Sequence, residues 1–566
     1  MSSISRPPPL PGFGINLDDM TAQKGLFPCA LDPDLEERES RYRMPILTLR
    51  EIRMLQFMNQ ITDKNDWEQK VFDETIAQKW KTEVMQGHRD GADFTLEMAD
   101  YCIEELKYKA ELLKKTGYVH VYNGDVVKSD CVIPADLQDA LRAAVARLED
   151  VPAKQKDWHP GSDDQVLDLV HPSLFPLVYG TSRILPNSTV GLEDCISRCG
   201  EGEVIPQPPE KLGIVTLGWP RLDFKSYSRR FQWLPCDVDI SGDTPKIVSY
   251  INNLHPKEHL GLYGIIERVI EKIIPLWNAT LSPLDEMKWP KRIHCDDSVD
   301  YNDLQEAIQP NAQPFSRDSV GGKDGDQGSV DLKRDYSDTG LQVIVKLANI
   351  HLTPEKPSYN GGTWHVEGQL NEHICATAIY YYDVENITPS HLAFRQASDV
   401  LEAEEEIGYE QGDWAWLEAI FGLQNEEPAI QTVGSVQARE GRVVTFPNLL
   451  QHCVQPFKLA DPTRPGHRKI LALFLVDPHT KIISTANIPC QQRDWWGKSI
   501  ISTNNHGLGM LPVELQAKVV QDVDDFPISL EKAKQLREEL MEERKHYMIG
   551  YHDSIFREVT ISLCEH

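Results

Sequence analysis

Residues 468–477 read RKILALFLVD, and three other runs have a similar composition: LQVIVKLANIHL at 341–352, HICATAIYYYDV at 373–384 and GRVVTFPN at 441–448. Each run is short, rich in β-branched and aromatic residues, and bounded by turn-forming residues, as β-strands are. Several such strands in succession predict a barrel or a jelly roll. We therefore expect a β-domain over residues 210–500, interrupted at 296–340 by an acidic, glycine-rich loop.

Apolar residues recur with helical spacing outside these runs. We expect an extended, proline-containing arm at 1–45, a mainly helical region at 46–209 and a helical cover at 501–566. A further helix is expected near residues 260–274, ended by Pro275. The expected fold class is α+β: a double-stranded β-helix (jelly-roll) core with an N-terminal helical region and a C-terminal helical cover. The cover helix, Leu530 to Tyr547, is either a lid over the site or a structural strut.

The composition narrows the class of partner. The chain has 58 basic and 87 acidic residues, a net charge of −29, so phosphate backbones and anionic lipids are repelled. We therefore expect neither nucleic acid nor a membrane as a partner, whereas the oligomeric state stays open. No apolar run is long enough to span a bilayer and the first residues lack a signal-peptide core, so we expect a cytoplasmic protein. The eleven cysteines lack a repeated metal-ligand spacing and are expected to be free thiols.

Two histidines and a carboxylate form a candidate metal site. His365 and Glu367 are two residues apart in NGGTWHVEGQL, which places both side chains on one face of a strand. His452 follows in FPNLLQHCVQPF. Two histidines and one carboxylate leave the other positions of an octahedral Fe(II) open, which is why non-heme oxygenases use this set.

The strand after His452 offers an anion anchor. Alternation in RKILALFLVD puts Arg468 on the same face as three apolar residues, and a guanidinium suits the distal carboxylate of 2-oxoglutarate. Tyr381 is placed to donate to the same carboxylate, and Thr377 shares its face. The flanking cations Arg464 and Lys469 are alternative anchors, and His373 is an alternative metal ligand.

These motifs, in this order, resemble the prolyl-hydroxylase-like branch of the Fe(II)/2-oxoglutarate dioxygenases over roughly residues 340–480. The acidic ligand is Glu where prolyl hydroxylases have Asp. Nearly the whole chain also resembles a fungal family known only as a domain of unknown function, whose members share runs such as VHPSLFPLVYGTS, SYINNLHP, GGTWHVEG and PGHRKILALFLVDP.

The resemblance implies a catalytic metal centre at His365, Glu367 and His452, and 2-oxoglutarate binding by Arg468, with Tyr381 and Thr377 as helpers. It further implies Fe(II), 2-oxoglutarate and O2 as cofactor and co-substrates, and hydroxylation, desaturation or cyclisation of a small-molecule or peptide substrate. Two alternatives remain: a non-catalytic or zinc-binding jelly-roll scaffold, and a cupin-like hydrolase or isomerase that holds zinc at the same three ligands.

Overall fold

The computed structural model describes residues 10–11, 14–15, 25–31, 43–87, 94–123, 125–209, 214–217, 222–225, 227–285, 288–295, 309–317, 329–400, 403, 407, 414–503, 511–523 and 526–558. Most of the expected arm at 1–45 lies outside them, as do residues 296–308 and 318–328 of the expected acidic loop. The end of that loop instead forms a short helix, Leu332–Tyr336, with Leu332 buried. The helices are α1 (Leu49–Thr62), α2 (Trp67–Lys70), α3 (Glu74–Gly87), α4 (Leu96–Thr116), α5 (Ala135–Glu149), α6 (Leu260–Asp285), α7 (Leu332–Tyr336), α9 (Arg493–Thr503), α10 (Val513–Gln521) and α11 (Leu530–Glu558).

The long strands belong to the β-domain, and short strands precede it. The strands before α6 are β1 (Leu10–Pro11), β2 (Gly14–Ile15), β3 (Met44–Pro45), β4 (Val119–His120), β5 (Val127–Ser129), β6 (Val166–Val170), β7 (Leu177–Val178), β8 (Arg183–Ile184), β9 (Glu203–Val204), β10 (Ile214–Leu217), β11 (Leu222–Lys225), β12 (Phe231–Gln232), β13 (Cys236–Asp239) and β14 (Lys246–Ile247). Those after it are β15 (Leu341–Leu352), β16 (Ser358–Tyr359), β17 (Ile374–Glu385), β18 (His391–Asp399), β19 (Ile430–Gln437), β20 (Val443–Pro447), β21 (Gln451–Val454), β22 (Phe457–Lys458) and β23 (Gly466–Val476).

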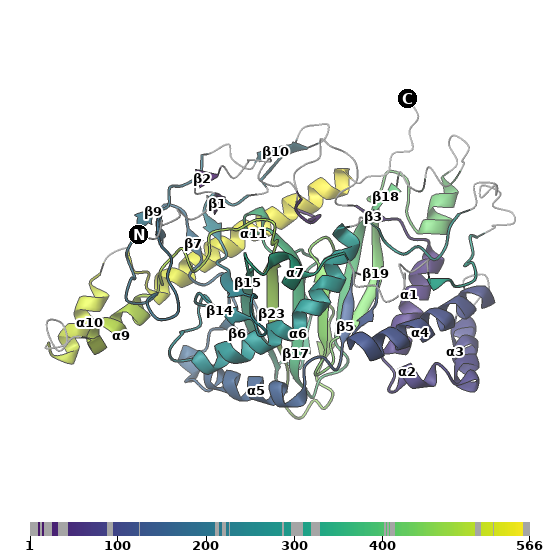
Figure 1. Ribbon diagram of the computed structural model, residues 1–566, viewed down its shortest axis with the longest axis horizontal. Coiled ribbons are helices and arrows are strands. Elements are labelled where there is room, and N and C mark those ends of the chain that lie inside the picture. The colour runs from purple at the N-terminus through teal and green to yellow at the C-terminus, as the bar shows by residue number, and fades with distance from the viewer. Residues whose placement is uncertain are drawn as a thin grey trace.

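A nine-stranded sheet dominates the molecule (Figure 1). Its order is β14-β13-β15-β23-β17-β20-β5-β4, and β6 pairs with the same edge of β15 as β13 does. In this sheet β23 lies between β15 and β17 and is antiparallel to both. A smaller sheet, β19-β18-β21, contributes aromatic residues such as Phe394 to the same apolar core as the inner face of the large sheet. The protein is thus a mixed α/β structure with large antiparallel sheets.

The two faces of the large sheet meet different partners because side chains alternate along each strand. Along β17, Ile379 and Tyr381 face the core shared with the smaller sheet. The residues between them, such as Tyr380, pack in the core that contains α5 and α6. Both faces are therefore buried, which explains the nearly continuous apolar runs of β15, β17 and β23.

Helix α6 differs from the expectation that it ends at Pro275. It runs on to Asp285, with Pro275 and Pro283 inside it. A proline inside a helix costs about 3 kcal/mol. Beyond Pro275, the side chains of Leu276, Trp277 and Leu281 are completely buried against the sheet, and this burial outweighs the cost.

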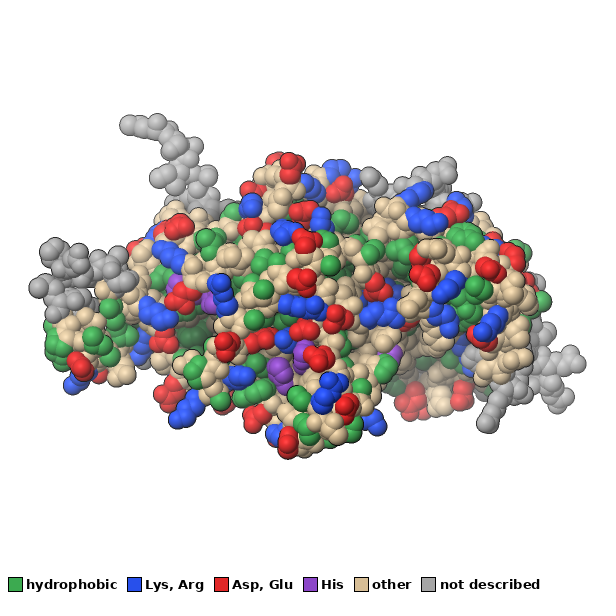
Figure 2. Space-filling view, turned by 90° about the horizontal axis from the view of Figure 1, so that it is seen from below, with side chains coloured by type: hydrophobic (Ala, Val, Ile, Leu, Met, Phe, Trp, Pro, Cys, Tyr) green, Lys and Arg blue, Asp and Glu red, His purple; other side chains and the backbone are tan. Residues whose placement is uncertain are grey.

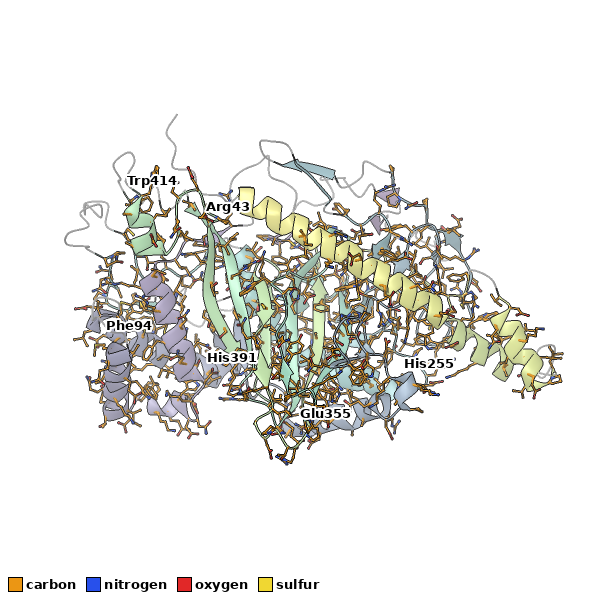
Figure 3. All side chains as sticks on the ribbon, turned by 180° about the vertical axis from the view of Figure 1, so that it is seen from behind. Arg43, Phe94, His255, Glu355, His391 and Trp414 are labelled. Carbon is orange, nitrogen blue, oxygen red and sulfur yellow. The ribbon has the colours of Figure 1, made fainter. Side chains whose placement is uncertain are left out.

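The N-terminal part is helical only up to α5. Helices α1 to α4 form a group beside the smaller sheet, where Phe94 marks their position (Figure 3). From residue 150 to 209 the chain instead forms turns and short strands. One of these, β6, extends the large sheet, so that this part of the expected helical region belongs to the β-domain.

The C-terminal helix α11 crosses obliquely over the ends of the strands (Figures 1 and 3). Leu536 and Leu540 are buried in the main core. Arg537 donates to both carboxylate oxygens of Asp157, at 2.6 and 3.1 Å. Further along, Tyr547 packs in a cluster with Val366, the residue between His365 and Glu367. These are the contacts of a structural strut, one of which reaches the residue between two of the candidate ligands.

The surface carries charges of both signs. Figure 2 shows Lys and Arg side chains interspersed with Asp and Glu over one face. Eight of the cysteines in the described ranges are free thiols, as expected: Cys102, Cys131, Cys195, Cys199, Cys236, Cys375, Cys453 and Cys490. None of the helices in those ranges combines the length and apolar character that a bilayer span requires.

Because α11 is a strut, truncating one of its core side chains should destabilise the whole protein. We expect Leu540→Ala to lower the free energy of unfolding by about 2 to 5 kcal/mol through the cavity it leaves. Leu530→Ala, on the same helix but with the side chain 44% exposed, should change it by less than about 0.5 kcal/mol. Urea unfolding followed by circular dichroism measures both. Equal effects of the two variants would show that α11 is only loosely attached.

Candidate metal centre

The structure brings His365, Glu367 and His452 together in one cluster. One ligand atom from each residue lies within 4.8 Å of the others. Glu367 Oε1 is 3.3 Å from His452 Nε2 and 3.8 Å from His365 Nε2. The two imidazole rings have centroids 4.3 Å apart. The three residues that sequence reasoning selected therefore form a two-histidine, one-carboxylate set.

The backbone positions these side chains. His365 and His452 form an isolated antiparallel bridge, in which each backbone N–H donates to the other's carbonyl, at 3.1 and 2.9 Å. The Glu367 N–H donates to Asn448 Oδ1 at 2.8 Å, and Asn448 Nδ2 donates back to the Glu367 carbonyl at 3.0 Å. Sequence reasoning missed Asn448 as a positioning residue, although it ends the GRVVTFPN run.

The protonation states suit metal binding. His365 Nδ1 is 2.8 Å from the Thr363 carbonyl, so Nδ1–H donates to it and Nε2 keeps a free lone pair. Burial, followed by repulsion from His452, lowers the pKa of His365 to about 4. Burial alone would raise the pKa of Glu367, but the hydrogen bond with His452 and the nearby positive charges lower it to about 2. At neutral pH the cluster therefore presents a neutral imidazole at His365 beside an ionised carboxylate at Glu367.

Arg468 lies on the same inner wall. Its side chain is 3% exposed and donates from Nη1 to Ser390 Oγ at 2.7 Å, while Nε has no hydrogen-bond partner. The guanidinium stands over the rings of Tyr381, at 5.6 Å, and Phe457, at 5.2 Å. Burial lowers the pKa of Arg468. Among the described residues no carboxylate forms an ion pair with it.

Residues of β17 and β20 on the inner face lie near both the triad and Arg468. The His452 ring is 4.7 Å from the Phe446 ring, and Phe446 pairs with Thr377 across β17 and β20. Thr377 is completely buried and its hydroxyl has no hydrogen-bond partner. Tyr381 follows Thr377 on the same face of β17. The two expected helper residues thus lie on one face of β17, Thr377 opposite Phe446 and Tyr381 under the Arg468 guanidinium.

The alternatives from the sequence lie elsewhere. Arg464 is exposed, 3.2 Å from Asp461, and Lys469 points to the outer face, 3.0 Å from Asp383 and 3.1 Å from Glu149. His373 follows the turn Leu370–Glu372 with a φ of 44°, which breaks the register with His365 as expected. It does not belong to the cluster.

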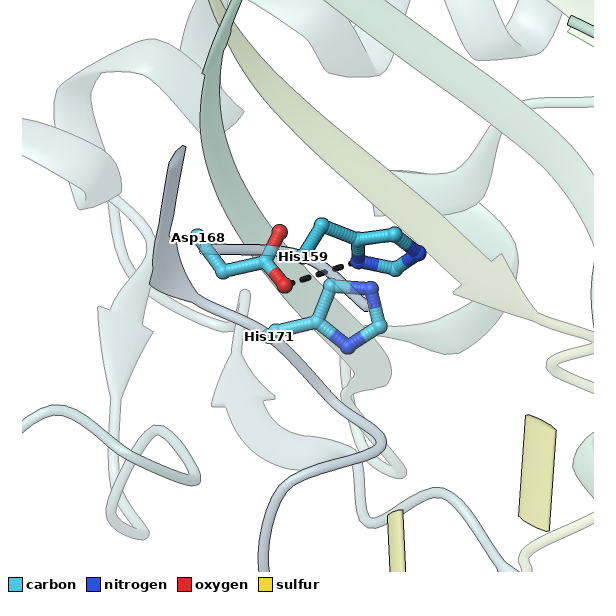
Figure 4. Close-up of side chains that lie close together, drawn as sticks. All are labelled: His159, Asp168 and His171. Atoms are coloured by element: carbon cyan, nitrogen blue, oxygen red, sulfur yellow. Dashed lines mark hydrogen bonds and ion pairs between the residues drawn. The ribbon is translucent and has the colours of Figure 1, made fainter. Parts of the chain in front are cut away.

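A second group, His159, Asp168 and His171, also has ligand-like spacing (Figure 4). Here Asp168 Oδ2 is bonded to His159 Nδ1 at 2.8 Å and lies 3.6 Å from Arg537 Nη1. His171 Nδ1 accepts the Ser173 N–H at 3.2 Å, so the ring proton sits on Nε2 and blocks that atom as a ligand. Arg537 thus supplies the positive charge that a metal ion would otherwise bring to Asp168. This group is therefore a hydrogen-bonded ion network. Sequence reasoning missed it, because no motif joins residues 159–171 to α11.

Comparison with known proteins identifies relatives only at the level of a family. A family described as "Protein of unknown function (DUF4246)" matches residues 96–499, and its N-terminal domain matches residues 10–83. No curated protein sequence matches the chain.

Solved structures give only distant likenesses. IDO from Bacillus thuringiensis is 12% identical over 25% of this chain and 46% of its own, with a TM-score of 0.14. An Fe(II)/α-ketoglutarate-dependent dioxygenase, TqaL, is 10% identical over 61% of this chain and 94% of its own, with a TM-score of 0.19. Procruciferin, an 11S globulin from Brassica napus, is 12% identical over 34% of this chain and 31% of its own, with a TM-score of 0.12. The match spans less than half of IDO and of procruciferin, and at these scores none of the three supports an argument.

The metal-binding prediction follows from the geometry. His365→Ala, Glu367→Ala and His452→Ala should each abolish stoichiometric Fe(II) binding, because two remaining protein ligands are too few to hold the ion. His159→Ala is the matched control and should retain it. Anaerobic equilibrium dialysis with metal analysis measures the stoichiometry. Full Fe(II) binding by a triad variant would remove that residue from the centre, and loss in His159→Ala would move the centre to the second group.

Proposed function

Since the chain belongs to the DUF4246 family, whose description assigns no activity, we propose from its own site that it is an Fe(II)/2-oxoglutarate-dependent dioxygenase. The substrate would be a small molecule or a peptide. His365, Glu367 and His452 would hold Fe(II), and Arg468 would bind the distal carboxylate of 2-oxoglutarate, assisted by Tyr381 and Thr377.

The unneutralised guanidinium of Arg468 carries this proposal. A buried charge is costly unless it is paired. Arg468 is 3% exposed and has only a hydroxyl and aromatic rings beside it within the described ranges. A bound carboxylate would neutralise it, and Thr377 Oγ1 offers a free polar group on the same wall. Arg468 and Thr377 would be the hydrogen-bond partners of the distal carboxylate of a dicarboxylate bound at the triad.

The strand order supports a double-stranded β-helix. From β15 to β23 the chain passes back and forth between the large sheet and the smaller sheets. Within the large sheet β23 separates β15 from β17, so consecutive strands are not neighbours there. The bridge between His365 and His452 joins the segment between β16 and β17 to β21. A jelly roll would have this kind of winding.

The residues fit the group that they would hold. A carboxylate and imidazole nitrogens suit Fe(II), and the second nitrogen of His365 is held by a carbonyl, as metal-bound histidines usually are. When bound, the iron would supply the activation of O2. In the overall reaction, 2-oxoglutarate loses CO2 and gains one oxygen atom to become succinate. The other oxygen atom enters a substrate C–H bond as a hydroxyl. Desaturation or cyclisation would instead release that atom as water.

The chain's own residues would orient the co-substrate and keep water away. Arg468 and Tyr381 would fix the far end of 2-oxoglutarate, and Asn448 would fix the backbone of Glu367. Phe446 packs against His452 and makes this wall of the site apolar. Val366, between two of the proposed ligands, packs in an apolar cluster with Tyr547 of α11.

The reaction itself is the test. Purified protein with Fe(II), ascorbate and 2-oxoglutarate should form succinate slowly without substrate, and faster with a substrate from a pool of metabolites and peptides. The Glu367→Ala protein is the control and should form none. Tight zinc binding with no succinate under any condition would contradict the dioxygenase and favour a zinc-holding scaffold on the same three ligands.

The anchor makes a quantitative prediction. Two charge-assisted hydrogen bonds of about 1.5 to 3 kcal/mol each are lost in Arg468→Ala, so its affinity for 2-oxoglutarate should fall by about 10² to 10⁴-fold. Tyr381→Phe should cost far less. Titration of the anaerobic Fe(II) protein, followed by the metal-to-ligand absorption band, measures this. Arg464→Ala is the surface control, and a large loss there with none in Arg468→Ala would move the anchor.

A further inference from the structure

Lys346 places an ammonium group on the inner wall of the large sheet. In the register of β15 and β23 it pairs with Ala472, and its strand neighbours on the same face include Ile344 and Ala348. The residues on either side of it, Val345 and Leu347, face the outer core around α6. Lys346 is thus a cation among the apolar side chains of the inner face. Its partner Ala472 lies midway between Ile470 and Phe474 on β23.

This lysine has no bonded partner. Within the part of the chain that the structure describes, its ammonium makes no ion pair and no hydrogen bond, although its side chain is half-buried. Lys469, on the other face of the neighbouring strand, is paired with both Asp383 and Glu149. The side chain of Lys346 is only partly buried and its nitrogen is not among the fully buried side-chain atoms, so the ammonium is within reach of a ligand.

Strand register places Lys346 near both histidine–carboxylate groups. It pairs with Ala472, which in turn pairs with Ile379 on β17, two residues from Thr377. On the other edge of β15, Asp168 of β6 pairs with Ala348, two residues from Lys346. The charge of Lys346 also acts on Glu367 and on Asp168. Asp168 already has His159 and Arg537 as partners. Glu367 and Asp168 therefore each interact with other residues, Glu367 with His452 and Asp168 with His159 and Arg537.

The charges of the loaded site leave Lys346 in excess, an argument that rests on the proposed function. The two positive charges of Fe(II) and that of Arg468 would balance Glu367 and the two carboxylates of 2-oxoglutarate. The histidine ligands would be neutral. One positive charge, that of Lys346, then remains without a counter-charge on the inner face of the large sheet.

We propose that Lys346 binds an anionic group of the substrate, a carboxylate or a phosphate, and holds the substrate beside the metal centre. The substrate class is thereby narrowed to small acids. Lys346 is a substrate-positioning residue in this account and has no role in binding the metal or 2-oxoglutarate.

The experiment measures the melting temperature of the full-length protein loaded with Mn(II) and 2-oxoglutarate, which fills Arg468 and prevents turnover. The probes are the common L-amino acids and small hydroxy acids, each beside its neutral carboxamide. Sugar phosphates, each beside the free sugar, form the phosphate arm. An acid at about 100 times its Kd should raise the melting temperature by about 2 °C, and its neutral partner should not. The arm that responds identifies carboxylate or phosphate.

Variants separate this site from the other cations. Lys346→Met should weaken binding of the responding acid by about 10- to 100-fold and leave the 2-oxoglutarate affinity within about twofold. Lys458→Met, at an exposed position on β22, should behave as the wild type. The inference is overturned if no acid in either arm stabilises the protein, if neutral partners stabilise it equally, or if Lys346→Met binds the acid normally. It is also overturned if Lys346→Met loses 2-oxoglutarate, since Lys346 would then be its anchor.

Failure of the proposed function gives a different result. In that case the protein would not take up Mn(II) with 2-oxoglutarate in the first step. The same titration of acids and amides on the metal-free protein would still test Lys346. If Lys346 binds the acid, Lys346→Met should bind it more weakly than the wild type does; if Arg468 binds it, the affinity of Lys346→Met should be unchanged.

Discussion

The positive charge of Arg468 is buried on the inner wall of the large sheet, and no carboxylate in the described ranges neutralises it. β23 is hydrogen-bonded on both sides, so alternation along it leaves this side chain only the inner face. If no anion bound beside Arg468, an apolar residue at this position would stabilise the core better than a buried arginine does. A bound anion would neutralise Arg468. It would also give the unpaired hydroxyl of Thr377 a hydrogen-bond partner, and Phe446 connects this part of the inner face to His452 of the triad.

The two histidine–carboxylate groups show why spacing alone does not define a metal centre. Both have three ligand-type atoms within 4.8 Å. In the triad, His365 has its Nδ1 occupied by a carbonyl and its Nε2 free. In the second group, both Nδ1 atoms are used, one by Asp168 and one by the Ser173 N–H, and Arg537 shares the carboxylate. Tautomer and nearby charge, more than distance, distinguish the group suited to a cation from the network that fastens α11.

The sequence predicted the local features and missed those that depend on distant contacts. The period of two in residues 468–477 predicted the inward direction of Arg468 and the outward direction of Lys469, and the structure has both. The family was also predicted and is confirmed. His365 and Glu367 meet His452 as expected, although they lie on a bridge and a bend instead of a regular strand. Helix α6 passes through Pro275 because a buried surface that the local rule ignores compensates for it. Asn448 fixes the backbone of Glu367, and Asp168 forms its network with Arg537 of α11, through contacts between segments far apart in the sequence, which periodicity does not reveal.

The most direct measurement is a crystal structure of the protein grown anaerobically with Mn(II) and 2-oxoglutarate, using anomalous scattering to locate the metal. The account predicts one strong anomalous peak between His365, Glu367 and His452, and electron density for 2-oxoglutarate that ends at the Arg468 guanidinium. A peak at His159, Asp168 and His171, or 2-oxoglutarate bound away from Arg468, would contradict it.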